Sequence, residues 1–185
     1  MAVLLGGPVL GTMPTSHASS KSPERRNELT LAGIRPGRDW LSGVVARYKQ
    51  PTHADDSSPT WMGACGREQL WVDIDSEMQV QALRVASRGK ASTGGSDGCQ
   101  SVLPSVWRTG RGLRTTDPCS RSVTLYGNPD SRSPSTKDGQ PLELLYYAFD
   151  WAGPDVPQVM QVVCTAEKDG QPGRVVQITL AASSL

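Results

Sequence analysis

The chain has 185 residues, of which 37% are hydrophobic, and a single Phe accompanies five Trp and four Tyr. Its 19 basic and 18 acidic residues leave a formal net charge of +1, and the basic residues are scattered, which argues against a nucleic-acid-binding surface. The length allows one domain or two small ones.

The N-terminal segment indicates export. Residues 2–13 form an apolar run that is too short to span a bilayer, and the following Ser16-His17-Ala18 has the small-x-small pattern of a signal-peptidase site. We therefore predict a signal peptide over residues 1–18, although the usual basic start is missing; a disordered leader is the alternative. No Cys follows the run, so no lipid anchor is expected. Residues 19–28 are polar and are predicted to be disordered.

Two parts of the chain share three short motifs. The first motif precedes an expected helix, the second ends it, and the third is an expected closing strand. The matches pair residues 33–35 with 112–114, 48–51 with 126–129, and 80–86 with 175–181. A period of this length predicts a duplicated domain rather than a solenoid. The expected fold is α+β, with two tandem repeats, each a short helix packed on an antiparallel sheet of three to four strands.

The first repeat is placed at residues 29–86. Apolar residues recur on one side of 40–48, which predicts an amphipathic helix that Pro51 ends. Strands are expected at 61–65, 70–75 and 80–85, and the middle one alternates apolar and polar residues with period two. Residues 87–110 are predicted to be a linker in which Trp107 docks on a core.

The second repeat is placed at residues 111–185. Asp117-Pro118 suits a helix start, and Cys119, Val123 and Tyr126 share one face of the helix that follows. Strands are expected at 142–151, 156–165 and 174–182.

The four cysteines, Cys65, Cys99, Cys119 and Cys164, form an even set without a CxxC pair or nearby zinc-ligand spacing. In an oxidising compartment they are expected to form two disulfides, with three possible connectivities. We favour Cys65–Cys99 and Cys119–Cys164, because each bridge then stays within one repeat.

Residues suited to catalysis are few. His53 lies near Asp55 and Asp56, but no nucleophile motif surrounds any Ser, so no catalytic residues are assigned. Asp73 and Asp75 share a strand face, which fits either calcium ligands or the solvated side of an edge strand, and the second interpretation is preferred. No metal site and no cofactor are predicted.

The aromatic residues indicate a binding surface. Trp71 shares a strand face with Asp73, and Tyr147, Phe149 and Trp151 share a face in the second repeat. These five residues are the predicted binding site, since exposed aromatic side chains dominate interface energetics. Tyr146 points the opposite way, together with Leu142 and Leu144, and is expected in the core.

The motifs at Gly33-Ile34, residues 48–51, Gly112-Leu113 and residues 126–129, with the closing strands, resemble the repeat of the beta-lactamase inhibitor protein, shared with small outer-membrane assembly lipoproteins. The resemblance covers residue 29 onward, apart from the linker. It implies two helix-on-sheet modules whose strands form a concave surface that binds a partner protein through aromatic and acidic residues.

The sequence therefore predicts a secreted or periplasmic, non-enzymatic protein-binding domain, including an inhibitor-like mode. A structural accessory domain of a bacterial envelope assembly is one alternative, and a secreted hydrolase with an unrecognised site is another. The expected partner is a protein, and neither nucleic acid nor a membrane anchor is expected.

Overall fold

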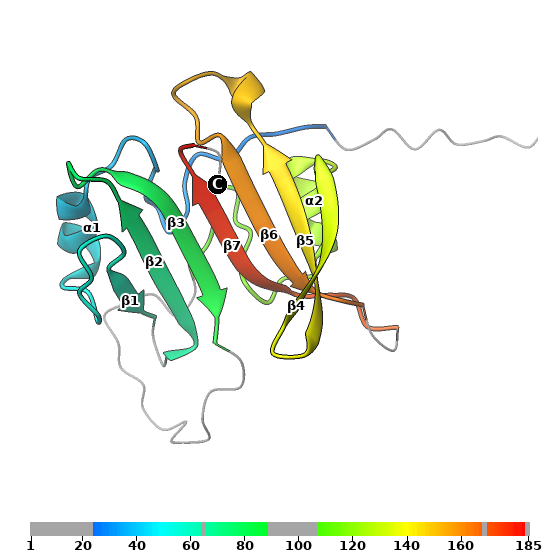
Figure 1. Ribbon diagram of the computed structural model, residues 1–185. Coiled ribbons are helices and arrows are strands. Elements are labelled where there is room, and N and C mark those ends of the chain that lie inside the picture. The colour runs from blue at the N-terminus through cyan, green and yellow to red at the C-terminus, as the bar shows by residue number, and fades with distance from the viewer. Residues whose placement is uncertain (1–23, 64–65, 89–106, 168–169, 184–185) are drawn as a thin grey trace, which may run out of the picture.

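The computed structural model describes residues 24–63, 66–88, 107–167 and 170–183. Seven strands form one antiparallel sheet in the order β1-β2-β3-β7-β6-β5-β4 (Figure 1). The expected signal peptide at 1–18, most of the expected linker, Cys65 and Cys99 lie outside the described residues.

The elements follow each other along the chain in two groups. The first group consists of α1 (Leu41–Tyr48), β1 (Thr60–Met62), β2 (Glu68–Ile74) and β3 (Val80–Ser87). The second consists of α2 (Ser120–Tyr126), β4 (Ser131–Lys137), β5 (Gln140–Ala148), the 3-10 turn η2 (Asp150–Ala152), β6 (Val159–Thr165) and β7 (Val175–Ala181).

The prediction of two separate helix-on-sheet repeats is wrong, because the strands of both groups belong to one sheet. β3 pairs with β7 in antiparallel register, from Ala82–Ala181 to Ala86–Gln177. The physical reason lies in these two strands. Alone, each would present a long apolar edge with unpaired backbone groups, and their pairing satisfies both edges.

One hydrophobic core lies on the helix side of this sheet. It joins Val44 of α1 and Tyr126 of α2 to Leu83 of β3 and Ile178 of β7, all of them buried. Trp107, which the sequence predicts to dock on a core, is 2% exposed and packs edge-on against Tyr48. The two groups of elements therefore share a core as well as a sheet.

Both helices lie close to their predicted positions. Each ends where the next residue takes a positive φ, at Lys49 with φ 67° and at Gly127 with φ 81°. At both positions the backbone N–H closes the last turn, bonding to the carbonyl oxygen of Val45 and Val123 respectively. Glycine adopts this left-handed region without a steric cost, which suits position 127.

The predicted disorder of residues 19–28 is wrong for the described part, 24–28. Glu28 is 2% exposed, and its carboxylate accepts hydrogen bonds from the backbone N–H of Leu29, Thr30 and Arg111. Arg26 donates its backbone N–H to the carbonyl oxygen of Tyr126. These hydrogen bonds hold residues 26–28 against Arg111 and Tyr126, which lie in the second half of the chain.

Candidate functional site

The face of the sheet opposite the two helices, called here the open face, carries a row of large and polar side chains. Successive registers place Trp71 opposite Arg84, Arg84 opposite Thr179, Thr179 opposite Gln161, and Gln161 opposite Tyr146. These five residues, one from each of the five inner strands, form the central row. Residues that sit directly opposite each other on neighbouring strands are within contact distance, so the row is continuous, although Thr179 at its centre is only 7% exposed.

Trp71 and Arg84 are the most closely associated pair of the central row. The Arg84 guanidinium lies over the indole ring, 4.5 Å from its centroid, which is the geometry of a cation–π interaction. The Nε atom of Arg84 is buried and makes no hydrogen bond to the described residues. Arg84 is also absent from the four ion pairs of that part of the chain. The side chain as a whole is only partly buried, so its terminal N–H groups, rather than Nε, are the donors that a ligand can reach.

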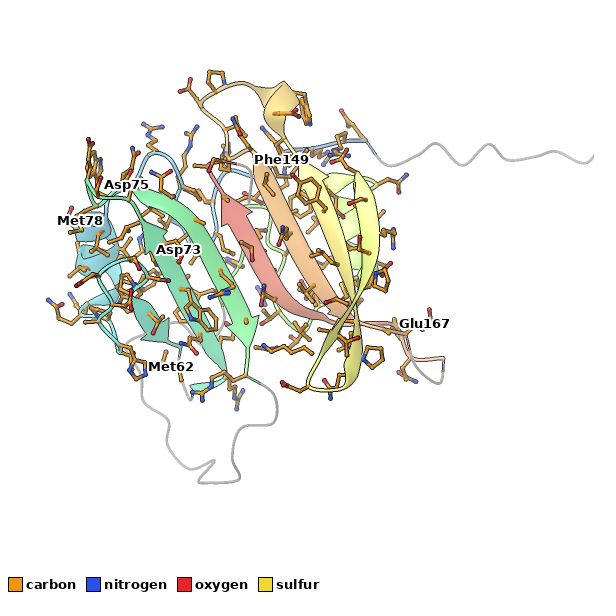
Figure 2. All side chains as sticks on the ribbon, in the orientation of Figure 1. Met62, Asp73, Asp75, Met78, Phe149 and Glu167 are labelled. Carbon is orange, nitrogen blue, oxygen red and sulfur yellow. A yellow bond between two sulfur atoms is a disulfide. The ribbon has the colours of Figure 1, made fainter. Side chains whose placement is uncertain are left out.

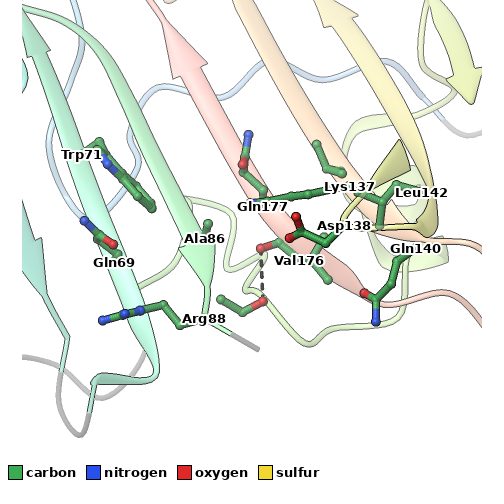
Figure 3. A pocket seen from close by; sticks show the side chains of 12 residues that line it. Gln69, Trp71, Ala86, Arg88, Lys137, Asp138, Gln140, Leu142, Val176 and Gln177 are labelled. Carbon is green, nitrogen blue, oxygen red and sulfur yellow. Dashed lines mark hydrogen bonds between the residues drawn. The ribbon is translucent and has the colours of Figure 1, made fainter. Parts of the chain in front are cut away.

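A groove of 590 Å³ runs across the open face beside the central row (Figure 3). Ala86, Val163 and Leu142 contribute small or apolar side chains to its lining, and Trp71 lines one side. The turn between β4 and β5 lines the other side, with Lys137 extending toward β7 (Figure 3). This volume is within the range of ordinary ligand pockets. Because residues of β2 and of the β4–β5 turn line the same groove, the sheet curves between them.

Both edges of the sheet are poor sites for an added strand. On one edge, Thr60 of β1 exchanges backbone hydrogen bonds with His53, at 3.0 and 3.2 Å. On the other edge, Pro134 lies in the middle of β4 and has no N–H to offer to an incoming strand. Pairing of an added strand is therefore disfavoured at both edges of the sheet.

A buried acid supports the start of β2, next to the groove. The carboxylate of Glu68 accepts a hydrogen bond of 2.8 Å from the backbone N–H of Trp107 and another from the hydroxyl of Thr115. Burial raises the pKa of the Glu68 carboxyl, and the two hydrogen bonds offset part of that effect. Glu68 thereby connects β2 to the segment that precedes α2.

Two of the five predicted binding residues lie on the open face. Trp71 is in the central row, and Asp73 lies further along β2 toward Asp75 (Figure 2). Asp73 faces Ala82 of β3, and its carboxylate accepts a hydrogen bond from the hydroxyl of Ser58.

The predicted exposure of Tyr147 and Phe149 is wrong, because both are fully buried. The Tyr147 ring lies 5.9 Å from that of Tyr126 and 6.4 Å from that of Phe149, in the core. The alternation of side chains along β5 was predicted correctly, but the face assigned to the core was the wrong one. Tyr147 faces the core, and Tyr146 lies on the open face. Trp151 is 58% exposed but belongs to η2, outside the strands of the sheet.

The Cys119–Cys164 disulfide is confirmed and connects the residue before α2 to β6, with a Cα–Cα distance of 5.9 Å. The predicted Cys65–Cys99 bridge falls on residues outside the described ranges.

Asp55, one of the two acidic residues near His53, stabilises a local turn. Asp55 accepts hydrogen bonds of 3.0 and 2.9 Å from the backbone N–H of Ser57 and Ser58, which hold the pKa of its carboxyl below the usual range. Within the described ranges, no group of three or more His, Cys, Asp or Glu side chains is placed to hold a metal ion. No helix in the same part of the chain is long and apolar enough to cross a membrane.

No protein-family model matches this chain, and no curated protein matches its sequence. Among solved structures, the chain is similar to a DUF4309 family protein from Bacillus subtilis, with a TM-score of 0.46 and 11% identity over 85% of this chain and 88% of that one. It is also similar to a cysteine-rich secretory protein from Staphylococcus aureus, with a TM-score of 0.44 and 7% identity over 85% of this chain and 48% of that one.

Proposed function

We propose that this chain is a non-enzymatic, extracytoplasmic binding protein that holds a partner protein on the open face of its sheet. The observation that carries the proposal is the central row, in which Trp71, Arg84 and Tyr146 lie on one uncovered surface. Trp, Arg and Tyr are the residue types that most often dominate the binding energy of protein interfaces.

The curvature of the sheet supports a protein partner. The groove beside the central row offers a Trp ring and apolar side chains surrounded by polar ones, which is the usual composition of an interface core and its rim. The proposal includes the inhibitor-like mode that the sequence resemblance implies, in which a concave sheet covers part of a partner's surface.

The extracytoplasmic location rests on cysteine chemistry. Cys119 and Cys164 form a disulfide between α2 and the sheet, and such bonds persist mainly in oxidising compartments. A secreted or periplasmic location follows from this bond together with the expected signal peptide.

The experiment that tests the proposal is partner capture with matched variants. The wild-type chain, Trp71→Ala, Tyr146→Ala and the control Trp151→Ala are each immobilised and exposed to envelope and secreted fractions of the producing cell. Trp151 is exposed and belongs to η2, outside the strands of the sheet, so its replacement removes an aromatic side chain that is not part of the central row.

We expect Trp71→Ala to weaken capture of a specific partner by about 2 kcal/mol or more, and Trp151→Ala to leave it unchanged. Circular dichroism establishes that each variant is folded. A partner retained equally by all variants would place the binding surface elsewhere, and a turnover lost on His53→Ala would refute the non-enzymatic assignment.

A further inference from the structure

We infer that the partner inserts a protruding acidic loop into the groove, with one carboxylate bound beside the groove by the terminal N–H groups of Arg84, which lies over the Trp71 ring. This inference rests on the proposed function, since it names the chemistry of the partner at the same surface.

The shape of the surface selects a loop. The groove is concave, with Trp71 on one side and the turn at Lys137 on the other, so a flat protein surface cannot reach its floor. An extended strand cannot join the sheet either, because Pro134 and the His53–Thr60 pair obstruct the two edges. A turn or loop that projects from the partner can enter the groove, so that the side chains at its tip contact the groove lining.

The positive charge of Arg84 favours a partner with a carboxylate. The Arg84 guanidinium is held over the Trp71 ring, and its buried Nε has no hydrogen-bond partner among the described residues. That atom is out of reach of a ligand, but the side chain is only partly buried, and a carboxylate is the group that two guanidinium N–H donors bind in a bidentate manner. The guanidinium is therefore oriented before a ligand arrives, which reduces the ordering cost of binding.

The residues of the neighbouring groove reinforce the same preference. Arg88 and Lys137 line the groove, and Asp138 is the one acidic residue of its lining, so the lining is net positive. Asp73 does not form an ion pair with Arg84 in the described part of the chain, and its carboxylate accepts the Ser58 hydroxyl instead. Amide side chains on the groove walls, including Gln177, supply further donors to backbone carbonyls of a loop.

The test uses a phage-displayed library of random loops closed by a disulfide, selected on the full chain. We expect the selected loops to carry Asp or Glu at a shared position. They should bind Arg84→Gln about tenfold more weakly or worse, as expected for loss of a charged hydrogen bond. The matched control is Arg132→Gln, which removes an exposed arginine paired with Glu143 away from the open face. Binding to this control should not change.

A second arm does not depend on how the Arg84 variant folds. Changing the shared Asp or Glu of a selected loop to Asn or Gln should cause the same loss on the wild-type chain. Loops that are sensitive to Trp71→Ala but carry no shared acid, and are insensitive to Arg84→Gln, would overturn the acidic-loop inference and leave the proposed function standing. Loops insensitive to Trp71→Ala would count against both.

A third arm separates an acidic loop from an anionic polysaccharide. A sulfated hexasaccharide is titrated into the wild-type chain and into Arg84→Gln by calorimetry. We expect it to bind more weakly than the selected loops. Tighter binding that depends on Arg84 would overturn the inference in favour of a polysaccharide ligand.

Discussion

The hydroxyl of Tyr126 donates a 2.7 Å hydrogen bond to the carboxylate of Glu28, 98 positions earlier in the chain. The same carboxylate accepts the backbone N–H of Arg111 at 2.9 Å. Burial raises the pKa of Tyr126, and the nearby Glu28 carboxylate raises it further. One buried acid thus joins the segment before α1 to the last residue of α2.

Replacing Glu28 should therefore destabilise the whole fold. Glu28→Ala leaves the buried hydroxyl of Tyr126 and three part-buried backbone N–H groups without this acceptor, and we expect the free energy of unfolding to fall by about 3 kcal/mol. Tyr126→Phe removes only one hydroxyl and should cost about 1 kcal/mol. Urea denaturation measures both variants. A Glu28→Ala variant as stable as the wild type would show that these hydrogen bonds contribute nothing.

The second prediction concerns pH and Glu68. Because burial raises the pKa of Glu68 in the folded state, the unfolded chain releases this proton first as the pH rises. The contribution of Glu68 to stability is therefore present below its unfolded pKa of about 4.3 and is lost as the pH rises through its folded pKa.

The variant Glu68→Gln cannot release that proton. We expect its stability relative to the wild type to increase between about pH 4 and about pH 8, measured by urea denaturation at each pH. Asp55 and Asp130 have lowered pKa values, but they are present in both proteins, so their effects cancel in the difference. A difference that stays constant with pH would contradict the prediction.

The third prediction concerns alkaline pH. Burial raises the pKa of Tyr48, Tyr126 and Tyr147, so these phenols keep their protons in the folded chain above the pH at which an unfolded chain loses them. Stability should fall as the pH rises beyond about 10. Ultraviolet difference absorbance should show that the three buried phenols ionise over the same pH range in which the chain unfolds. Their ionisation before any loss of circular dichroism would contradict their burial.

The fourth prediction concerns the disulfide. Cys119 and Cys164 are 45 positions apart, and loop-entropy reasoning gives the bond about 4 kcal/mol of stabilisation. The double variant Cys119→Ala with Cys164→Ala should melt roughly 10 °C lower, as measured by calorimetry. An unchanged melting temperature would mean that the unfolded chain is already restricted at this place.

The fifth prediction concerns the edge of the sheet. Pro134→Val adds a backbone N–H in the middle of β4, where a second chain can pair. We expect concentration-dependent association in sedimentation velocity experiments. Ser133→Val is the matched control, because it adds the same side chain while keeping Pro134. If both variants associate equally, the added Val side chain, and not the added backbone N–H, causes the association.

Much of the local structure could be predicted from the sequence. The apolar spacing identified α1, and the alternation from Leu70 to Ile74 identified β2. β4 was missed, because its sequence of serines, charged residues and Pro134 has no apolar face. The pairing of β3 with β7 was missed for a different reason. Local periodicity shows that a strand exists but does not specify which distant strand it meets.

The site was predicted in part, and β5 explains why. Leu144 and Tyr146 alternate with Leu145 and Tyr147, so both faces of this strand are apolar and the pattern does not identify the core side. For β2 the choice was clear, because Trp71 shares its face with polar Gln69 and Asp73. The pairing of Arg84 with Trp71 could have been inferred only from the register of β2 and β3.

The position of β7 has a consequence for the order in which the chain can be completed. This strand is the last of the seven in the sequence, yet it lies between β3 and β6 in the sheet. A chain that emerges N-terminal end first from a ribosome or a secretion channel therefore cannot close its sheet until residues 175–181 have arrived. Until then β3 is paired only with β2 and β6 only with β5, and the edge that each will turn toward β7 is open to chaperones and proteases. Fragments cut before β7 lack the strand that joins the two groups, so quality control can distinguish them from the finished protein.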